Sequence, residues 1–172
     1  MSSSYFIFCD DENKESFTFP GGLSFFFEQY GGFDNQSEVA QLSVLLQIDL
    51  SVFQQYDVPE SDEVTWHEIS VVKNKMEEFI AKLKSAPSVF QSIKYGSESS
   101  QFPNELMQAG QARDVKRLQE LIRQMQNDPQ ATYPLNRGYI ESGNLINDLT
   151  ALDAKLKESE QDGVKKIKFL YM

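Results

Sequence analysis

The chain of 172 residues carries 26 acidic and 16 basic residues, which gives a formal net charge of −10 at pH 7. A hydrophobic content of 40% and an aromatic content of 12% are typical of a globular protein and exclude an intrinsically disordered chain. The length predicts one globular domain spanning residues 1–172. The single cysteine, Cys9, excludes an internal disulfide framework.

The sequence lacks the patterns that direct a chain to a membrane or out of the cell. No segment approaches the roughly 20 consecutive apolar residues that a membrane-spanning helix needs. The apolar run from Tyr5 to Cys9 is too short for a secretion signal, and no cationic segment precedes it. We therefore expect a soluble, cytoplasmic protein that does not bind membranes.

Negative charge is concentrated in the amino-terminal part of the chain. Residues 1–72 contain thirteen acidic residues against Lys14 alone, whereas residues 73–172 contain thirteen acidic and fifteen basic residues. An acidic half of this kind disfavours nucleic acid and anionic lipid, and favours a basic protein partner. The alternative is a solvated acidic surface that only keeps the protein soluble.

The first part of the chain contains two short strand patterns and two short helix patterns. Residues 3–9 are rich in aromatic residues and end at an acidic turn, which predicts a strand, and residues 16–19 predict a second one. Residues 23–30 lie between glycine pairs and predict a short helix. Residues 38–54 fit both the strand period and a helical stripe; we favour a helix over 37–46, followed by an irregular or short helical segment to Gln55.

The segment from Val64 to Leu83 has the clearest helical pattern, and we expect a helix over residues 66–85. Thr65 precedes Glu68 by three residues, which is the spacing of a capping box with Thr65 as the N-cap. Pro87 prevents continuation of the helix. The predicted buried stripe consists of Trp66, Ile69, Val72, Met76, Phe79, Ile80 and Leu83.

Two further helices and a terminal strand complete the predicted elements. We expect helices over residues 104–127 and 142–161, joined by a loop over residues 132–138, with Gly110 as a weak point in the first. Alternating apolar and lysine side chains predict a half-buried strand over residues 164–171. The predicted fold is therefore a helix-rich α+β single domain, in which the three main helices pack on a small sheet formed by the strands at 3–9 and 164–171.

Catalytic and metal-binding patterns are weak in this sequence. His67-Glu68 begins like a zinc-protease motif, but the second histidine of that motif is absent because the chain has one histidine. A helical wheel places His67 on the exposed face of the predicted helix. Cys9 and His67 are the only thiol and imidazole that could form a nucleophilic pair. We expect no metal and no cofactor, and we do not expect an enzyme.

The leading interpretation is a small acidic protein-binding domain. Immunity-type inhibitors of bacterial toxins are proteins of this class, so we expect an inhibitor that occludes the active site of a basic toxin. The alternatives are an enzyme that uses carboxylates or the Cys9/His67 pair, and a structural or accessory subunit. The predicted partner-binding residues are Asp10, Asp11, Glu12, Asp57, Glu60, Asp62, Glu63 and His67.

Overall fold

The structure is a computed structural model, and it describes residues 5–28, 37–57, 65–94, 108–127 and 135–171. Its contacts divide the chain into two compact units. Unit 1 comprises Met1–Ile93 and Tyr139–Met172, and unit 2 comprises Lys94–Gly138. Both helices and a five-stranded sheet are present, which confirms the predicted α+β class.

The sheet of unit 1 is organised around the last strand of the chain. Its strands are β1 (Tyr5–Cys9), β2 (Phe17–Thr18), β3 (Tyr56–Asp57), β4 (His67–Glu68) and β5 (Lys166–Tyr171). The strand order is β2-β1-β5-β3, and β4 also pairs with β5. β1 and β5 are antiparallel along their length, which confirms the prediction that the first and last strands share one sheet.

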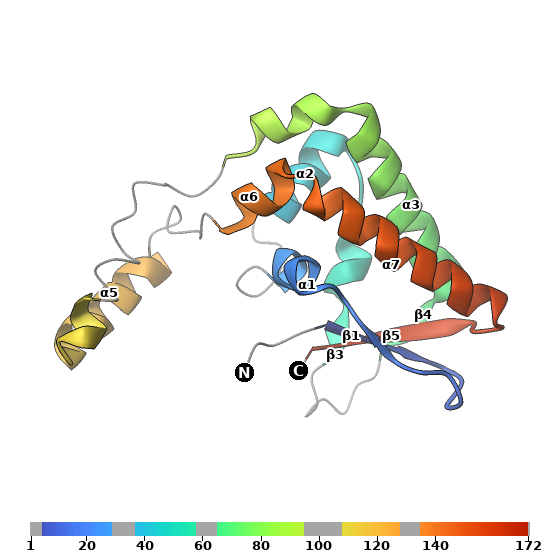
Figure 1. The fold of residues 1–172 in the computed structure, drawn as a ribbon, viewed down its shortest axis with the longest axis horizontal. Helices are drawn as coiled ribbons and strands as arrows, with labels where there is room; N and C mark the ends of the chain where they lie inside the picture. Colours follow the sequence, from blue (N-terminus) through green and yellow to red (C-terminus); the bar gives the residue numbers. More distant parts are fainter. Residues whose placement is uncertain (1–4, 29–36, 58–64, 95–107, 128–134, 172) are drawn as a thin grey trace. The chain divides into compact units, whose positions relative to one another are not determined.

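The helices of unit 1 lie on one side of this sheet (Figure 1). They are α1 (Gly21–Glu28), α2 (Glu38–Leu46), α3 (Ile69–Ser85) and α7 (Asn144–Gln161), with short 3-10 helices η1 (Ser51–Gln54) and η2 (Pro87–Ser92). A further short helix, α6 (Leu135–Glu141), belongs to unit 1 from Tyr139 onwards. The helical interpretation of residues 37–46 is confirmed, because the Ser37 side chain accepts a hydrogen bond from the Ala40 N–H as the N-cap of α2.

Aromatic side chains fill the space between the sheet and these helices. Phe27 of α1 stacks on Phe53 of η1 with ring centroids 4.9 Å apart, and Phe19 meets Phe169 of β5 at 5.8 Å. Tyr5 of β1 stacks on Phe19 at 5.4 Å. Each ring is almost completely buried, so this cluster fixes the sheet beneath the helices.

The two longest helices, α3 and α7, pack against each other and carry charged pairs along their contact. Lys73 of α3 pairs with Glu160 of α7, and Glu77 pairs with Lys157 at 2.9 Å. Lys157 also pairs with Asp153 one turn earlier. In the described part of the chain, no helix combines the length and apolar character needed to span a bilayer.

The start of α3 differs from the sequence prediction. His67 and Glu68 pair with Ile167 and Lys166 of β5, so the chain is extended here and the helix begins only at Ile69. The predicted capping box at Thr65 is therefore wrong, and Trp66 is 40% exposed instead of lying in the core. The rest of the predicted stripe is confirmed as the buried face of α3.

The two later helices also differ from their predicted bounds. Residues 135–138, predicted as part of a loop, belong to α6, and α7 begins at Asn144 after Gly143, whose φ is +85°. In unit 2 the predicted helix over 104–127 is divided into a helical turn at residues 108–111 and α5 (Val115–Asn127). The break lies at residues 112–114, close to Gly110. The Asp114 side chain accepts a hydrogen bond from the Arg117 N–H at the start of α5. Residues 104–107 lie outside the described residues.

Candidate functional site

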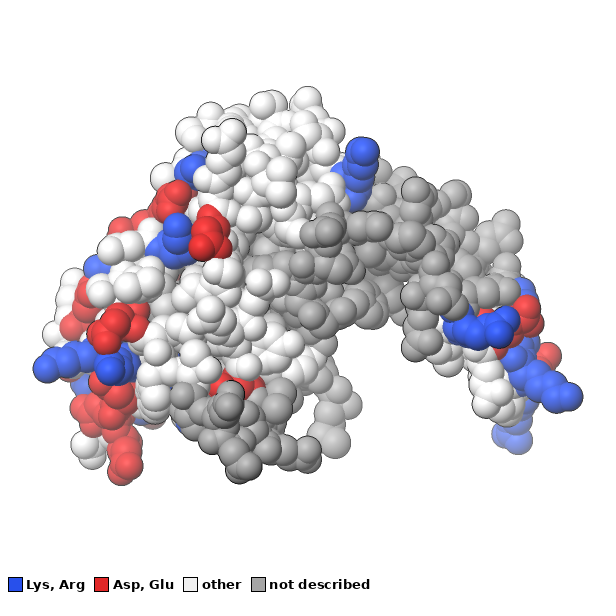
Figure 2. All heavy atoms as spheres, turned by 180° about the vertical axis from the view of Figure 1, so that it is seen from behind, with Lys and Arg blue, Asp and Glu red and all other residues white. Residues whose placement is uncertain are grey.

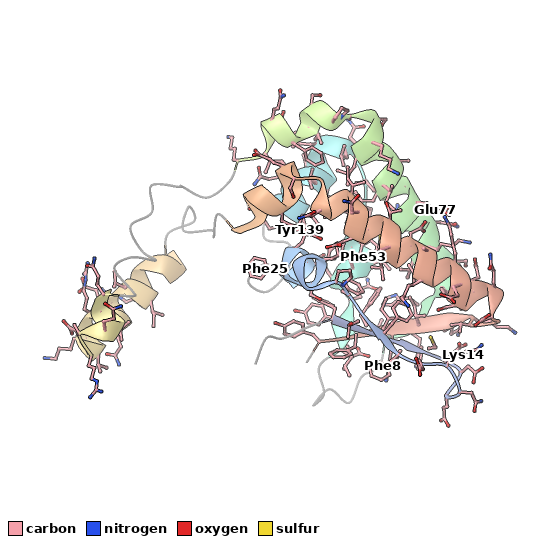
Figure 3. The ribbon with its side chains drawn as sticks, in the orientation of Figure 1. Phe8, Lys14, Phe25, Phe53, Glu77 and Tyr139 are labelled. Carbon is pink, nitrogen blue, oxygen red and sulfur yellow. The ribbon has the colours of Figure 1, made fainter. Side chains whose placement is uncertain are left out.

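The two faces of the sheet differ in what covers them. Tyr5, Ile7 and Phe169 point towards the helices and are buried. Side chains alternate along a strand, so Phe6 and Phe8 point to the opposite face. Among the described residues of unit 1, no helix lies on that side (Figure 1). We call it the outer face, and Figure 3 shows Phe8 on it while Phe53 lies between the sheet and the helices.

A lysine between two aromatic rings forms the centre of the outer face. Phe8 of β1 pairs with Lys168 of β5, and Trp66 lies on the other side of that lysine. The Lys168 ammonium lies 5.7 Å from the centroid of the Phe8 ring and 5.3 Å from the centroid of the Trp66 ring. These distances are those of cation–π contacts, so the two rings hold the lysine in place.

The neighbouring cross-strand pairs of the outer face differ in polarity. On one side of the central lysine, Phe6 pairs with Leu170, which extends the apolar surface. On the other side, the Lys166 ammonium lies 3.5 Å from the carboxylate of Glu68. The outer face therefore combines large apolar side chains with two lysines, each of which already contacts a group of the protein.

The turn between β1 and β2 carries exposed acidic residues beside the outer face. We call residues 10–15 the hairpin tip: it contains Asp10, Asp11, Glu12 and Glu15 against one lysine, Lys14. Figure 2 shows acidic side chains, interspersed with basic ones, at this end of the molecule.

Hydrogen bonds and an ion pair fix the hairpin tip. Asp11 accepts a hydrogen bond from the Asn13 N–H at 2.9 Å, and the hydrogen bonds from Asn13 lower the pKa of Asp11. Asp10 accepts a hydrogen bond from the Lys165 N–H at 3.2 Å, and the ammonium of Lys14 lies 3.1 Å from the carboxylate of Asp162. Three of the predicted partner-binding residues, Asp10, Asp11 and Glu12, are thus brought together in an ordered turn.

Asp57 lies in a different environment from the one that the sequence predicts. It is the second residue of β3 and is only 7% exposed. Its two carboxylate oxygens accept hydrogen bonds from the Thr65 N–H at 3.2 and 3.1 Å. Asp57 therefore has a structural role in closing the chain between β3 and β4, whereas Glu60, Asp62 and Glu63 lie outside the described residues.

The prediction that His67 is exposed on a helix is wrong. His67 lies in β4, is 8% exposed, and has its ring centroid 5.4 Å from that of Phe169. Its Nε2 atom lies 3.1 Å from the carbonyl oxygen of Gln55, which accepts a hydrogen bond from this nitrogen when it is protonated. The pairing of β4 with β5 turns this side chain inward, so it does not contribute to an external surface.

The sheet separates Cys9 from His67. Each pairs with Ile167 of β5, one from β1 and the other from β4, so the two lie about two strand spacings apart, roughly 10 Å. That distance is too long for a hydrogen bond between thiol and imidazole. Burial, followed by the charges of Asp10 and Asp11, raises the pKa of Cys9, which disfavours the reactive thiolate.

The described residues contain no group of three His, Cys, Asp or Glu side chains placed to hold a metal ion. Elsewhere the polar contacts are structural. The Tyr139 hydroxyl donates a hydrogen bond to Asp148 at 2.7 Å, and its ring packs on Gly22. Burial and this hydrogen bond raise the pKa of Tyr139, so the hydroxyl remains a donor.

The outer face was not predicted from the sequence, although the sequence contains a signal for it. Every residue of β1 is apolar or aromatic, a pattern expected of a strand covered on both faces. The described helices of unit 1 cover one face only. The apolar residues of the second face are therefore unexplained by the internal packing of unit 1. No protein-family model, curated protein or solved structure matches this chain.

Proposed function

We propose that this chain is a protein-binding domain whose partner is a basic protein. The observation that carries the proposal is the charge of unit 1, which contains 21 acidic and 10 basic residues and therefore has a net charge of −11. Unit 2 has five acidic and six basic residues, so the negative charge belongs to unit 1. A field of this sign attracts cationic proteins and repels nucleic acids.

In this proposal the basic partner contacts the hairpin tip. Asp10, Glu12 and Glu15 are exposed there, and Lys14 is engaged by Asp162. A fixed turn of carboxylates loses little conformational freedom when it meets cationic side chains. Buried Asp57 and His67 are not part of this proposed surface.

The specific form of the proposal is an immunity-type inhibitor of a basic toxin. Such an inhibitor works by covering the toxin's active site, and its carboxylates occupy positions that a phosphate-bearing substrate would take. The domain then needs no catalytic residue of its own. The acidic charge accelerates association, and the contact area determines how long the complex lasts.

The test is a charge reversal at the hairpin tip. The partner is recovered with the chain from its native cell, purified, and measured against the Glu12→Lys/Glu15→Lys variant by stopped-flow kinetics. We expect the association rate at low ionic strength to fall about tenfold, because steering depends on the local field. The difference should shrink as salt is raised to screen the charges.

The control is Glu77→Lys/Glu78→Lys on α3, which changes the net charge equally. Glu77 lies away from the hairpin tip, which Lys14 marks in Figure 3. These glutamates form partly exposed ion pairs that the reversal turns into like-charge contacts, so circular dichroism checks that the control keeps its fold. A partner that is acidic, or equal association rates for the wild type and the hairpin variant, would remove the proposed function.

A further inference from the structure

The outer face of the sheet is an apolar surface in a position where solvated sheets carry polar residues. An antiparallel sheet covered on one side normally has polar side chains on the other. Here the outward positions include Phe6, Phe8, Trp66 and Leu170. Trp66 is exposed and the other three are half-buried, and partly exposed apolar residues that lie side by side mark interaction surfaces. Aromatic residues, and tryptophan above all, are the residues that contribute most to binding energy in protein interfaces.

The charges around the outer face indicate which occupant it fits. Its two lysines are already engaged, Lys166 by Glu68 and Lys168 by the rings of Phe8 and Trp66. The adjoining hairpin tip carries four acidic residues against one lysine. The uncompensated charge beside the apolar surface is therefore negative.

This negative charge disfavours two other occupants. Single-stranded nucleic acid stacks on aromatic sheet surfaces, but it needs a positively charged groove for its backbone. A second copy of the chain would bring another net charge of −10 towards the first. A protein surface with apolar side chains and a basic rim is complementary to both the outer face and the hairpin tip.

We infer that the outer face docks an apolar patch of the basic partner, with Phe8 and Trp66 as its main contacts. This inference rests on the proposed function and adds a second surface to it. The hairpin tip steers the partner, and the outer face retains it by excluding water from the contact. The two surfaces therefore affect different rate constants.

The chain supplies its own reporter for this surface. Trp66 is the only tryptophan, it is 40% exposed, and it lies beside Lys168 on the outer face. An occupant that covers the face changes the polarity around the indole. Trp66 fluorescence therefore follows occupancy without an added label.

The first experiment uses probes of defined chemistry. A peptide of alternating leucine and lysine is titrated against the full chain, beside a leucine–glutamate peptide of equal length and an oligothymidylate. We expect a saturable shift of Trp66 emission with the leucine–lysine peptide alone. Stronger binding of the other peptide or of the oligonucleotide would overturn the inference. A shift with protein concentration alone, accompanied by dimerisation, would assign the face to a second copy instead.

Matched variants localise the binding. Phe8→Thr removes an outer-face ring but keeps a residue that favours strands, and Val71→Thr changes a 55% exposed side chain of α3. We expect the first variant to weaken peptide binding about tenfold and the second to leave it unchanged. Circular dichroism checks the fold, and Leu170→Thr replaces Phe8→Thr if that variant does not fold. Equal weakening by the outer-face variant and Val71→Thr would overturn the inference.

Kinetics with the purified partner separate this inference from the proposed function. Phe8→Thr should raise the dissociation rate about tenfold and leave the association rate and its salt dependence unchanged. The hairpin-tip variant should do the reverse. If only the effect of Phe8→Thr is absent, the docking assignment fails and the proposed function stands. If the effect of the hairpin variant is absent, the proposed function fails.

Discussion

Gly22 and Tyr139 make a contact that requires a glycine. A Cβ atom added at Gly22 would lie 2.4 Å from Cε2 of the Tyr139 ring. The ring cannot move away easily, because its hydroxyl is held by the hydrogen bond to Asp148. This contact joins α1 to α6, and the hydrogen bond to Asp148 joins α6 to α7.

A pair of glycine substitutions tests this contact at the scale of single residues. Gly22→Ala should lower the free energy of unfolding by about 1–3 kcal/mol, because the added methyl group displaces the Tyr139 ring. A Cβ atom added at Gly138 would have no neighbour within 4 Å. Gly138→Ala should therefore raise the free energy of unfolding by roughly 0.5–1 kcal/mol, the usual gain of alanine over glycine in a helix. Urea denaturation measures both. Effects of the same sign would contradict the packing described here.

At the scale of elements, two helix starts with similar sequence signals have different structures. Ser37 precedes Glu38 and caps α2 through its side chain. Thr65 precedes Glu68 by three residues, but its backbone N–H donates to Asp57, and α3 begins four residues later. The difference arises because the pairing of β4 with β5 holds residues 67 and 68 in an extended conformation.

Alanine substitutions distinguish the two positions. Ser37→Ala should cost about 1 kcal/mol of stability, because the Ala40 N–H loses its acceptor in a partly buried position. Thr65→Ala keeps the backbone hydrogen bond to Asp57 and should change stability by less than about 0.5 kcal/mol. Thermal unfolding followed by circular dichroism provides the comparison. A larger loss at Thr65 than at Ser37 would restore the capping box that the sequence suggested.

At the scale of the whole molecule, the sequence predicts one domain and the structure contains two compact units. Unit 1 has its own core, which includes Leu149 of α7. In unit 2, Leu121 of α5 is completely buried. Substitutions at these two leucines test whether the two units unfold in one cooperative transition.

Matched core substitutions provide the test. Leu149→Ser should lower the free energy of unfolding reported by Trp66 by at least about 3 kcal/mol, because it leaves a cavity and a polar group in the core of unit 1. Leu121→Ser should leave the Trp66 transition unchanged, since Trp66 belongs to unit 1. An equal shift in both variants would show that the chain unfolds as one cooperative domain.

Much of the fold follows from local patterns in the sequence. The apolar spacing along α3 and α7, the stop at Pro87 and the turn at Gly163 are signals that neighbouring residues provide by themselves. The alternation of Ile167, Lys168 and Phe169 likewise fixed which side of β5 faces the helices. These features need only local geometry and the burial of apolar surface.

Which side chains lie on the surface of the molecule depends on its tertiary structure. Charge composition alone favoured a basic partner, and it placed Asp10, Asp11 and Glu12 in one acidic turn. The burial of Asp57 and His67 results from strand pairs between residues roughly 100 positions or more apart, which no local pattern records. The pairing of β1 and β4 with β5 brings Phe8, Lys168 and Trp66 together on the outer face. The sequence by itself therefore determined the elements and the sign of the charge, whereas only the pairing of β5 with three other strands decided which side chains meet a partner.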